Sequence, residues 1–192
     1  MKIKDLKNNK GYTIIETMIA VSLFLVIVTI ATGALLNANL VHQKSQNMRS
    51  IIDNLSFIME DMSRNLRTGY AYNCGDVNVE NPTDCPSGGS ILYFEEANGK
   101  KANSSDQWGY SIGDGFIDKT TDGGLSWMTL TPSEVYIDQG LSSFIVTGTK
   151  PGDKYQPFVT IKLVGSITYK DVVTPFSLQT SVSQRLIDRQ AL

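Results

Sequence analysis

The chain has 192 residues, of which 41% are hydrophobic and 19% charged, and its formal net charge is −2. The apolar fraction is close to the globular average, which excludes a wholly disordered chain. The mild acidity leaves no basic stripe for nucleic-acid phosphates, and one His with two Cys cannot build a His/Cys zinc site. We therefore expect neither direct nucleic-acid binding nor a zinc centre.

The N-terminal segment is basic and is followed by a long apolar run. Four Lys and one Asp lie within residues 1–11, and no Asp, Glu, Lys or Arg occurs between Glu16 and Lys44. The apolar stretch around residues 14–36 is long enough to cross a hydrocarbon core of ~30 Å as a helix. By the positive-inside rule, the basic flank keeps the N-terminus in the cytoplasm. We expect one membrane-crossing helix with everything downstream outside the cytoplasm.

Glu16 opens this apolar run, where a carboxylate is costly and usually has a functional partner. A simple position in the headgroup region is the alternative. The string KGYTIIE, residues 10–16, resembles the class III signal of type IV prepilins and pseudopilins. The resemblance implies that prepilin peptidase cuts between Gly11 and Tyr12 and methylates Tyr12, where the family usually has Phe. It also implies that Glu16 meets the free amine of Tyr12 on a neighbouring subunit during assembly.

The helix is expected to continue well beyond the membrane. Apolar side chains recur at steps of three and four residues from Met48 to Leu66, which predicts an amphipathic helix whose stripe packs on a following sheet. Arg64 and Arg67, followed by Gly69, indicate its end. We therefore predict a leader over residues 1–11, a helix over residues 12–67 and an extracytoplasmic β-rich domain over residues 68–192.

The predicted fold class is α+β, a pilin-like arrangement in which the outer half of the helix packs on an antiparallel β-sheet domain. Apolar and polar residues alternate in the last two candidate strands, as is typical of half-buried antiparallel strands. The candidate strands are Ile91–Glu95, Trp108–Ile112, Phe116–Lys119, Ser126–Leu130, Val135–Asp138, Ser143–Thr147, Phe158–Tyr169 and Phe176–Leu186.

Cys74 and Cys85 fall in the exported part by this topology and therefore in an oxidising compartment. A disulfide between them would close a short loop and contribute roughly 3 kcal/mol in the loop-entropy picture. The single His, His42, lies on the helix next to the membrane, so a catalytic Cys would lack a basic partner. We expect no enzymatic activity.

A further short motif, TTDGGLSW over residues 120–127, resembles the Asp-box hairpin of extracellular β proteins. The resemblance implies that Asp122 bonds the amides of its own turn, that a glycine takes positive φ and that Trp127 packs under the hairpin. Asp114, Asp118 and Asp122 could also offer oxygens to Ca²⁺, but their spacing is not D-x-D-x-D. Turn chemistry is favoured, so no cofactor is expected and Ca²⁺ stays as the alternative.

Two later fragments, Trp127–Val135 and Phe176–Arg185, are similar to C-terminal stretches of minor pilins and pseudopilins related to the J and W components. The resemblance implies a structural subunit, minor rather than major, of a type IV pilus (fimbrium) or type II secretion-like filament. It would lie first in the inner membrane and then in an extracellular or periplasmic filament. Its partners would be prepilin peptidase, other pilins and an inner-membrane platform with its ATPase. The alternative is a binding module, an adhesin or a DNA or glycan receptor, displayed by the same helix.

Overall fold

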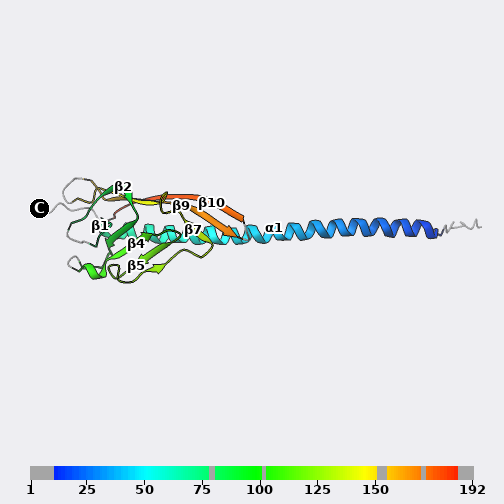
Figure 1. Ribbon diagram of the computed structural model, residues 1–192, viewed down its shortest axis with the longest axis horizontal. Coiled ribbons are helices and arrows are strands. Elements are labelled where there is room, and N and C mark those ends of the chain that lie inside the picture. The colour runs from blue at the N-terminus through cyan, green and yellow to red at the C-terminus, as the bar shows by residue number, and fades with distance from the viewer. Residues whose placement is uncertain (1–10, 78–80, 101–102, 151–154, 170–171, 186–192) are drawn as a thin grey trace, which may run out of the picture. The chain divides into compact units, whose positions relative to one another are not determined.

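The computed structural model describes residues 11–77, 81–100, 103–150, 155–169 and 172–185. Apart from Gly11, the expected leader lies outside these ranges. The chain divides into two compact units, Met1–Gln46 and Asn47–Leu192. Helix α1 (Ile14–Thr68) contributes residues to both of them (Figure 1).

The described part of the first unit is helical from Ile14 onward, and its apolar side chains are exposed. The helix is long and apolar enough to cross a membrane, and none of its most apolar window, of mean hydropathy 2.6, is buried by the chain itself. The hydroxyls of Thr29 and Thr32 donate to helix carbonyls, those of Leu25, Val26 and Val28. This pairing satisfies polar groups that lipid could not. An apolar surface of this extent requires lipid or other helices to cover it.

The second unit begins with the remaining turns of α1, whose apolar stripe is buried. The six buried helix residues are Ile51, Leu55, Ile58, Met59, Met62 and Leu66. The helix ends at Thr68, one residue later than predicted, because the Thr68 hydroxyl bonds the carbonyls of Arg64 and Asn65. The compact unit therefore starts at Asn47, earlier than the residue 68 expected for the domain, because the helix supplies part of its core.

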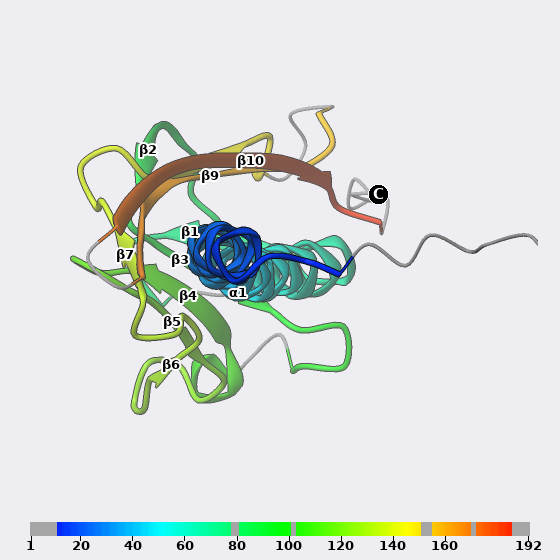
Figure 2. The same cartoon turned by 90° about the vertical axis from the view of Figure 1, so that its right-hand side faces the viewer.

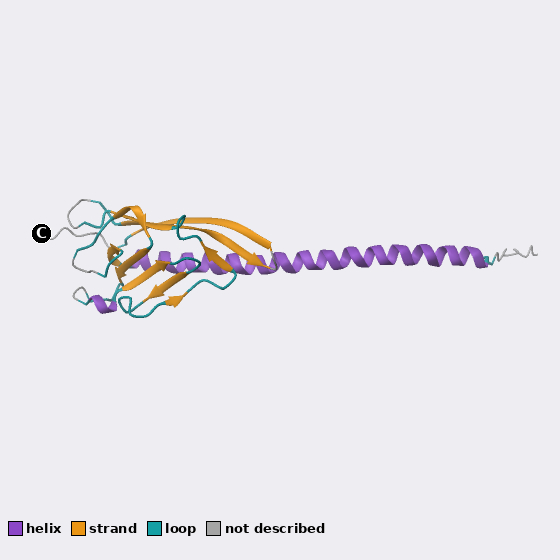
Figure 3. Cartoon of the chain, in the orientation of Figure 1, coloured by secondary structure: helices purple, strands orange, loops and turns teal. Residues whose placement is uncertain are grey.

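Two antiparallel sheets complete this unit, and their strands are distinguished from helix and loops in Figure 3. The first sheet has the order β1 (Tyr70–Cys74), β3 (Ile91–Glu95), β4 (Trp108–Ile112), β5 (Ile117–Thr120) and β6 (Met128–Thr129). The second has the order β10 (Val172–Ser183), β9 (Phe158–Tyr169), β8 (Ser143–Thr147) and β2 (Cys85–Gly89), with β7 (Val135–Ile137) also pairing with β9. A short 3-10 helix, η1 (Ser104–Asp106), precedes β4.

The core of the second unit joins the helix to both sheets. One cluster of buried side chains includes Met62 of α1, Phe94 and Tyr110 of the first sheet, and Phe144 and Ile161 of the second. Figure 2 shows strands of the two sheets on opposite sides of α1. The α+β fold predicted from the sequence is confirmed.

Most predicted strands are present, several with the predicted bounds. Strand β5 begins one residue later than expected, and β6 is shorter than the predicted Ser126–Leu130 because Ser126 bonds within a turn. Strand β10 begins at Val172 instead of Phe176 and ends at Ser183; the expected end at Leu186 lies outside the described residues. Strands β1 and β2 are not among the predicted strands. In β1 the polar Asn73 interrupts the apolar run, and the sequence of β2, CPSGG, has no apolar alternation.

The expected disulfide between Cys74 and Cys85 is present, with Cα atoms 6.0 Å apart. Cys74 ends β1 in the first sheet and Cys85 begins β2 in the second. The bond therefore ties the two sheets together as well as closing the intervening loop. It also explains why so irregular a sequence as β2 holds a strand position.

Candidate functional site: the processing and assembly segment

The residues at the expected cleavage site immediately precede helix α1. Thr13 caps the helix, since its Oγ1 accepts the backbone N–H of Glu16 at 3.3 Å and its carbonyl accepts that of Thr17 at 3.2 Å. The spacing from Thr13 to Glu16 is that of a capping box. Gly11 and Tyr12 lie outside the helix, and Tyr12 is 82% exposed. The Gly11–Tyr12 bond thus lies in accessible, non-helical backbone immediately before the start of the helix.

Glu16 is the acidic residue of the first helical turn, and it is exposed. A carboxylate near a helix N-terminus is favoured by the helix dipole. The ion pairs found within the described residues are Glu60 with Arg64 and Asp61 with Lys119, and neither involves Glu16. Its carboxylate is therefore available to a positive group from outside the described chain.

Comparison with known proteins identifies this segment. Residues 6–32 match the family model described as the prokaryotic N-terminal methylation motif. The chain has a type IV prepilin-like N-terminus. The match spans the expected cleavage site, Glu16 and much of the apolar run, and it supports a pilin-like or pseudopilin precursor. No curated protein and no solved structure gives a match.

A prepilin-type motif implies processing by the peptidase that recognises it and assembly with other pilins. The apolar, uncovered first part of α1 fits anchoring in a membrane before assembly. This site could be predicted from the sequence because its residues follow one another along the chain. The capping role of Thr13 is an addition from the structure, although the T-x-x-E pattern could have indicated it.

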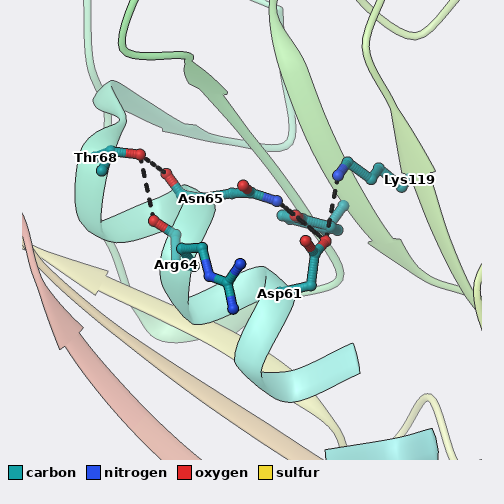
Figure 4. A network of polar contacts seen from close by, with 6 residues as sticks. Asp61, Arg64, Asn65, Thr68 and Lys119 are labelled. Carbon is teal, nitrogen blue, oxygen red and sulfur yellow. Dashed lines mark hydrogen bonds and ion pairs between the residues drawn. The ribbon is translucent and has the colours of Figure 1, made fainter. Parts of the chain in front are cut away.

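A polar network on the second unit was not anticipated (Figure 4). Lys119 of β5 reaches Asp61 of α1, with Nζ and Oδ2 3.2 Å apart, and the Lys119 side chain is only 14% exposed. The Asn65 amide donates to Asp61 at 3.0 Å and to the Tyr110 hydroxyl at 2.8 Å. Lys119 Nζ also lies 4.5 Å from the Trp108 ring centroid, within cation–π range. The network fastens the last turns of α1 to the first sheet.

The Asp-box-like hairpin has the predicted internal bonding. Asp122 Oδ1 accepts the Thr120 hydroxyl at 2.7 Å and the Ser126 N–H at 2.9 Å, while the Ser126 hydroxyl donates to Oδ2. These hydrogen bonds, those from Ser126 first, lower the pKa of Asp122 to about 2. Gly123 and Gly124 have φ of +69° and +89°, and Trp127 meets Tyr93 edge-on at 6.1 Å. The predicted hydrogen bonds and positive φ values are confirmed, whereas Trp127 remains 37% exposed and covers the hairpin only in part.

The three aspartates considered for Ca²⁺ are not brought into one ligand set. Asp114 accepts the Tyr136 hydroxyl at 2.6 Å, and Asp122 is occupied by its own turn. Asp118 lies on β5. Within the described ranges, no group of three or more His, Cys, Asp or Glu side chains is placed to hold a metal ion.

Proposed function

We propose that the chain is a non-enzymatic structural subunit, a minor pilin or pseudopilin, of a type IV pilus or type II secretion-like filament. The observation that carries this proposal is the N-terminal methylation motif at residues 6–32, which extends into a long and uncovered apolar helix. Inserted with its N-terminus in the cytoplasm, the precursor would be cleaved after Gly11 and methylated on Tyr12. The inner-membrane platform with its ATPase would then move the subunit into the filament.

The residues at the start of the helix explain both the cleavage and the later pairing of Glu16. The exposed backbone at Gly11 and Tyr12 can enter a protease active site as an extended strand, while the Thr13 cap keeps the helix from extending through the cleavage point. Cleavage creates an α-amine, the positive group that Glu16 lacks within the described chain. A pair between this amine and Glu16 of another subunit removes the cost of an unpaired carboxylate at membrane depth.

Association of the helices follows from the exposed apolar face of α1. Side chains such as Ile19 (62% exposed) and Phe24 (63% exposed) are solvated by lipid in the membrane and would be covered by neighbouring helices in a filament. Exchange of lipid for helix contacts is favourable when packing is close. The mechanism of the protein is therefore polymerisation.

Mass spectrometry of the N-terminus of the protein isolated from its native host tests the proposal. The expected result is a chain that begins at Tyr12 and carries one N-methyl group. A second measurement, detection of the protein in sheared filaments by antibody, tests incorporation. An intact Met1, or a cut at any other position, contradicts the proposal.

A helix-displayed binding module stays the second candidate. The specific observation in its favour is the exposed apolar surface of the Asp-box-like hairpin, where Leu125 of the turn is 84% exposed and Met128 of the following strand β6 is 62% exposed. Glycan or DNA binding by the full chain, lost on replacement of Leu125 by Ser, would support this role. The full chain is needed because the globular unit uses residues of α1 in its core.

A further inference from the structure

The polar network of Figure 4 brings an amine, a carboxylate and a carboxamide together in the second unit. Lys119 Nζ lies 3.2 Å from Asp61 Oδ2, and the Asn65 amide donates to the same oxygen at 3.0 Å. Asp61 and Asn65 are four residues apart on α1, so their side chains lie on one face of the helix. The cluster lies outside the processing segment and is independent of the proposed function.

Lys119 occupies a position of β5 that faces the core. Side chains alternate along a strand, so Lys119 projects from the same face as the fully buried Ile117. Its Nζ lies 4.5 Å from the centroid of the Trp108 ring and 5.7 Å from that of the Tyr110 ring, and the side chain is only 14% exposed. The amine is thus held beside aromatic rings and directed at α1.

Tyr110 holds the carboxamide next to the carboxylate. Its hydroxyl accepts a hydrogen bond from the Asn65 amide at 2.8 Å and donates one to Asp61 Oδ2 at 3.5 Å. Its ring is fully buried and stacks on Phe94, with the two centroids 5.8 Å apart. The Asn65 side chain therefore stays beside Asp61, and the amine and the carboxamide have the same carboxylate as their neighbour.

An ion pair explains why Asp61 lies beside Lys119, but the third group gives the cluster a chemical capacity. A neutral Lys amine is a nucleophile, and a carboxylate placed between an amine and an amide can take a proton from the first and return it to the second. Well-oriented groups held together by a fold react with effective concentrations of about 10⁵–10⁸ M. The three groups are therefore those needed to transfer an acyl group from an amide nitrogen to an amine nitrogen.

We propose that Lys119 and Asn65 form an intramolecular amide (isopeptide) bond, with Asp61 as the proton carrier. The ammonium gives one proton to Asp61 Oδ2, and the neutral Nζ attacks Cγ of Asn65 to form a tetrahedral intermediate. Asp61 returns this proton to Nδ2, the Cγ–Nδ2 bond breaks and ammonia leaves, while Nζ loses a second proton to Asp61. Ammonia carries that proton away as ammonium, which restores the carboxylate. Nothing is oxidised or reduced, and no co-reactant is needed.

The bond would connect the last turns of α1 covalently to β5 of the first sheet. The disulfide between Cys74 and Cys85 already joins the two sheets. The two cross-links together would connect the helix to both sheets, and the helix would stay attached after the disulfide is reduced. In SDS under reducing conditions the chain would keep one closed loop, between residues 65 and 119, and would migrate faster than a linear chain.

Mass spectrometry of the full-length protein, purified in detergent micelles and then reduced and alkylated, tests the proposal. The expected mass is lower by about 17 Da, one ammonia, than that of the same chain without the bond. Trypsin should release a branched peptide in which residues 65–67 are joined to a segment left uncut after Lys119. This peptide distinguishes the bond from ammonia lost elsewhere. An unaltered mass, or a loss of about 18 Da from a bond to Asp61 with release of water, overturns the proposal.

Variants of the three groups keep the test decisive. K119R keeps a positive charge beside Asp61 but replaces the amine by a guanidinium, which stays protonated and is no nucleophile, so it is expected to show no loss of ammonia. N65L removes the carboxamide and is expected to behave in the same way. D61N is expected to form the bond at least about tenfold more slowly, because it cannot carry the proton.

The matched control is K162R, which alters a lysine of β9 that lies opposite Gln179 of β10. This variant is expected to lose ammonia as the unaltered protein does. The proposal is overturned if K119R or N65L retains the lower mass, if D61N forms the bond at the unaltered rate, or if K162R abolishes it. Each of these outcomes leaves the N-terminal processing result unaffected.

Discussion

Three carboxylates on α1 have very different surroundings. These surroundings indicate which of them serves assembly and which stabilises the fold. Glu16 is exposed and makes no ion pair within the described residues, whereas Asp61 holds Lys119 and Asn65 beside the first sheet. Glu60, one position earlier, pairs with Arg64 while both side chains stay about 70% exposed, at 70% and 69%. The same chemical group therefore serves three roles along one helix.

Replacement of Glu16 by Ala should leave membrane insertion and cleavage intact but reduce filament incorporation at least about tenfold, because an unpaired amine would then be buried on assembly. Immunoblotting of sheared filaments against the membrane fraction measures this ratio. Glu60→Ala, on the exposed part of the same helix, serves as the control and should assemble as the unaltered chain does. Normal incorporation of Glu16→Ala would show that the charge pair is not needed.

Replacement of Asp61 by Asn should lower the free energy of unfolding by about 1–3 kcal/mol, because the nearly buried Lys119 ammonium loses its carboxylate. Glu60→Gln removes the exposed pair on the neighbouring position and should cost no more than about 0.5 kcal/mol. Thermal or denaturant unfolding of the two variants measures the difference. Equal destabilisation would mean that the Asp61 network contributes no more than a surface pair.

At the level of elements, regular strands could be predicted from the sequence and irregular ones could not. Strand β9 alternates buried and partly exposed residues over much of its length, a pattern that depends only on its own sequence. Strand β2 has no such pattern, and it pairs with β8 through a shifted register beside the disulfide. Its position depends on contacts with distant residues, which local propensity does not contain.

Gly165 shows how closely neighbouring strands approach. It lies in β9 opposite Ile137 of β7 and Phe176 of β10, and an added Cβ would lie 2.1 Å from the Tyr136 carbonyl oxygen. Gly165→Ala should therefore destabilise the fold by about 1–3 kcal/mol through overpacking.

The control for this change is Gly140→Ala, where the nearest atom to an added Cβ is Asp138 Oδ1 at 3.4 Å. Both substitutions reduce the entropy of the unfolded chain alike, so their difference isolates the steric effect. Urea unfolding of both variants measures it. A Gly165→Ala variant as stable as Gly140→Ala would mean that β7 can move away without cost.

For the whole molecule, the boundary between the units falls within α1 and not at its end. The second unit starts at Asn47. A fragment of residues 47–192 should fold with a single cooperative transition, because it retains all six buried helix side chains. A fragment of residues 69–192 should not fold, since loss of six buried apolar side chains removes about 10 kcal/mol or more, comparable to a typical total stability of about 5–15 kcal/mol.

Circular dichroism during heating distinguishes these fragments, with the full chain in detergent as the reference. A cooperative transition in residues 69–192 at the temperature of the longer fragment would show that the helix is dispensable to the core.

The candidate sites, like the strands, differ in whether they can be predicted from the local sequence. The processing motif and the Asp-box-like hairpin are contiguous, so the sequence alone indicated both. The Asp61–Lys119 contact depends on how α1 packs against β5. No local pattern around Lys119 specifies such a partner, and the contact could be seen only in the folded structure.

The order of elements along the chain also determines when each part of the core is synthesised. The buried stripe of α1 is made before every strand that covers it, and core residues such as Ile167 of β9 are made much later. At about 5–20 residues per second, the interval between Leu66 and Ile167 lasts on the order of 5–20 s. Throughout that interval the stripe has no complete intramolecular cover, so a nascent chain of this design depends on chaperones or on the membrane to keep it from aggregating.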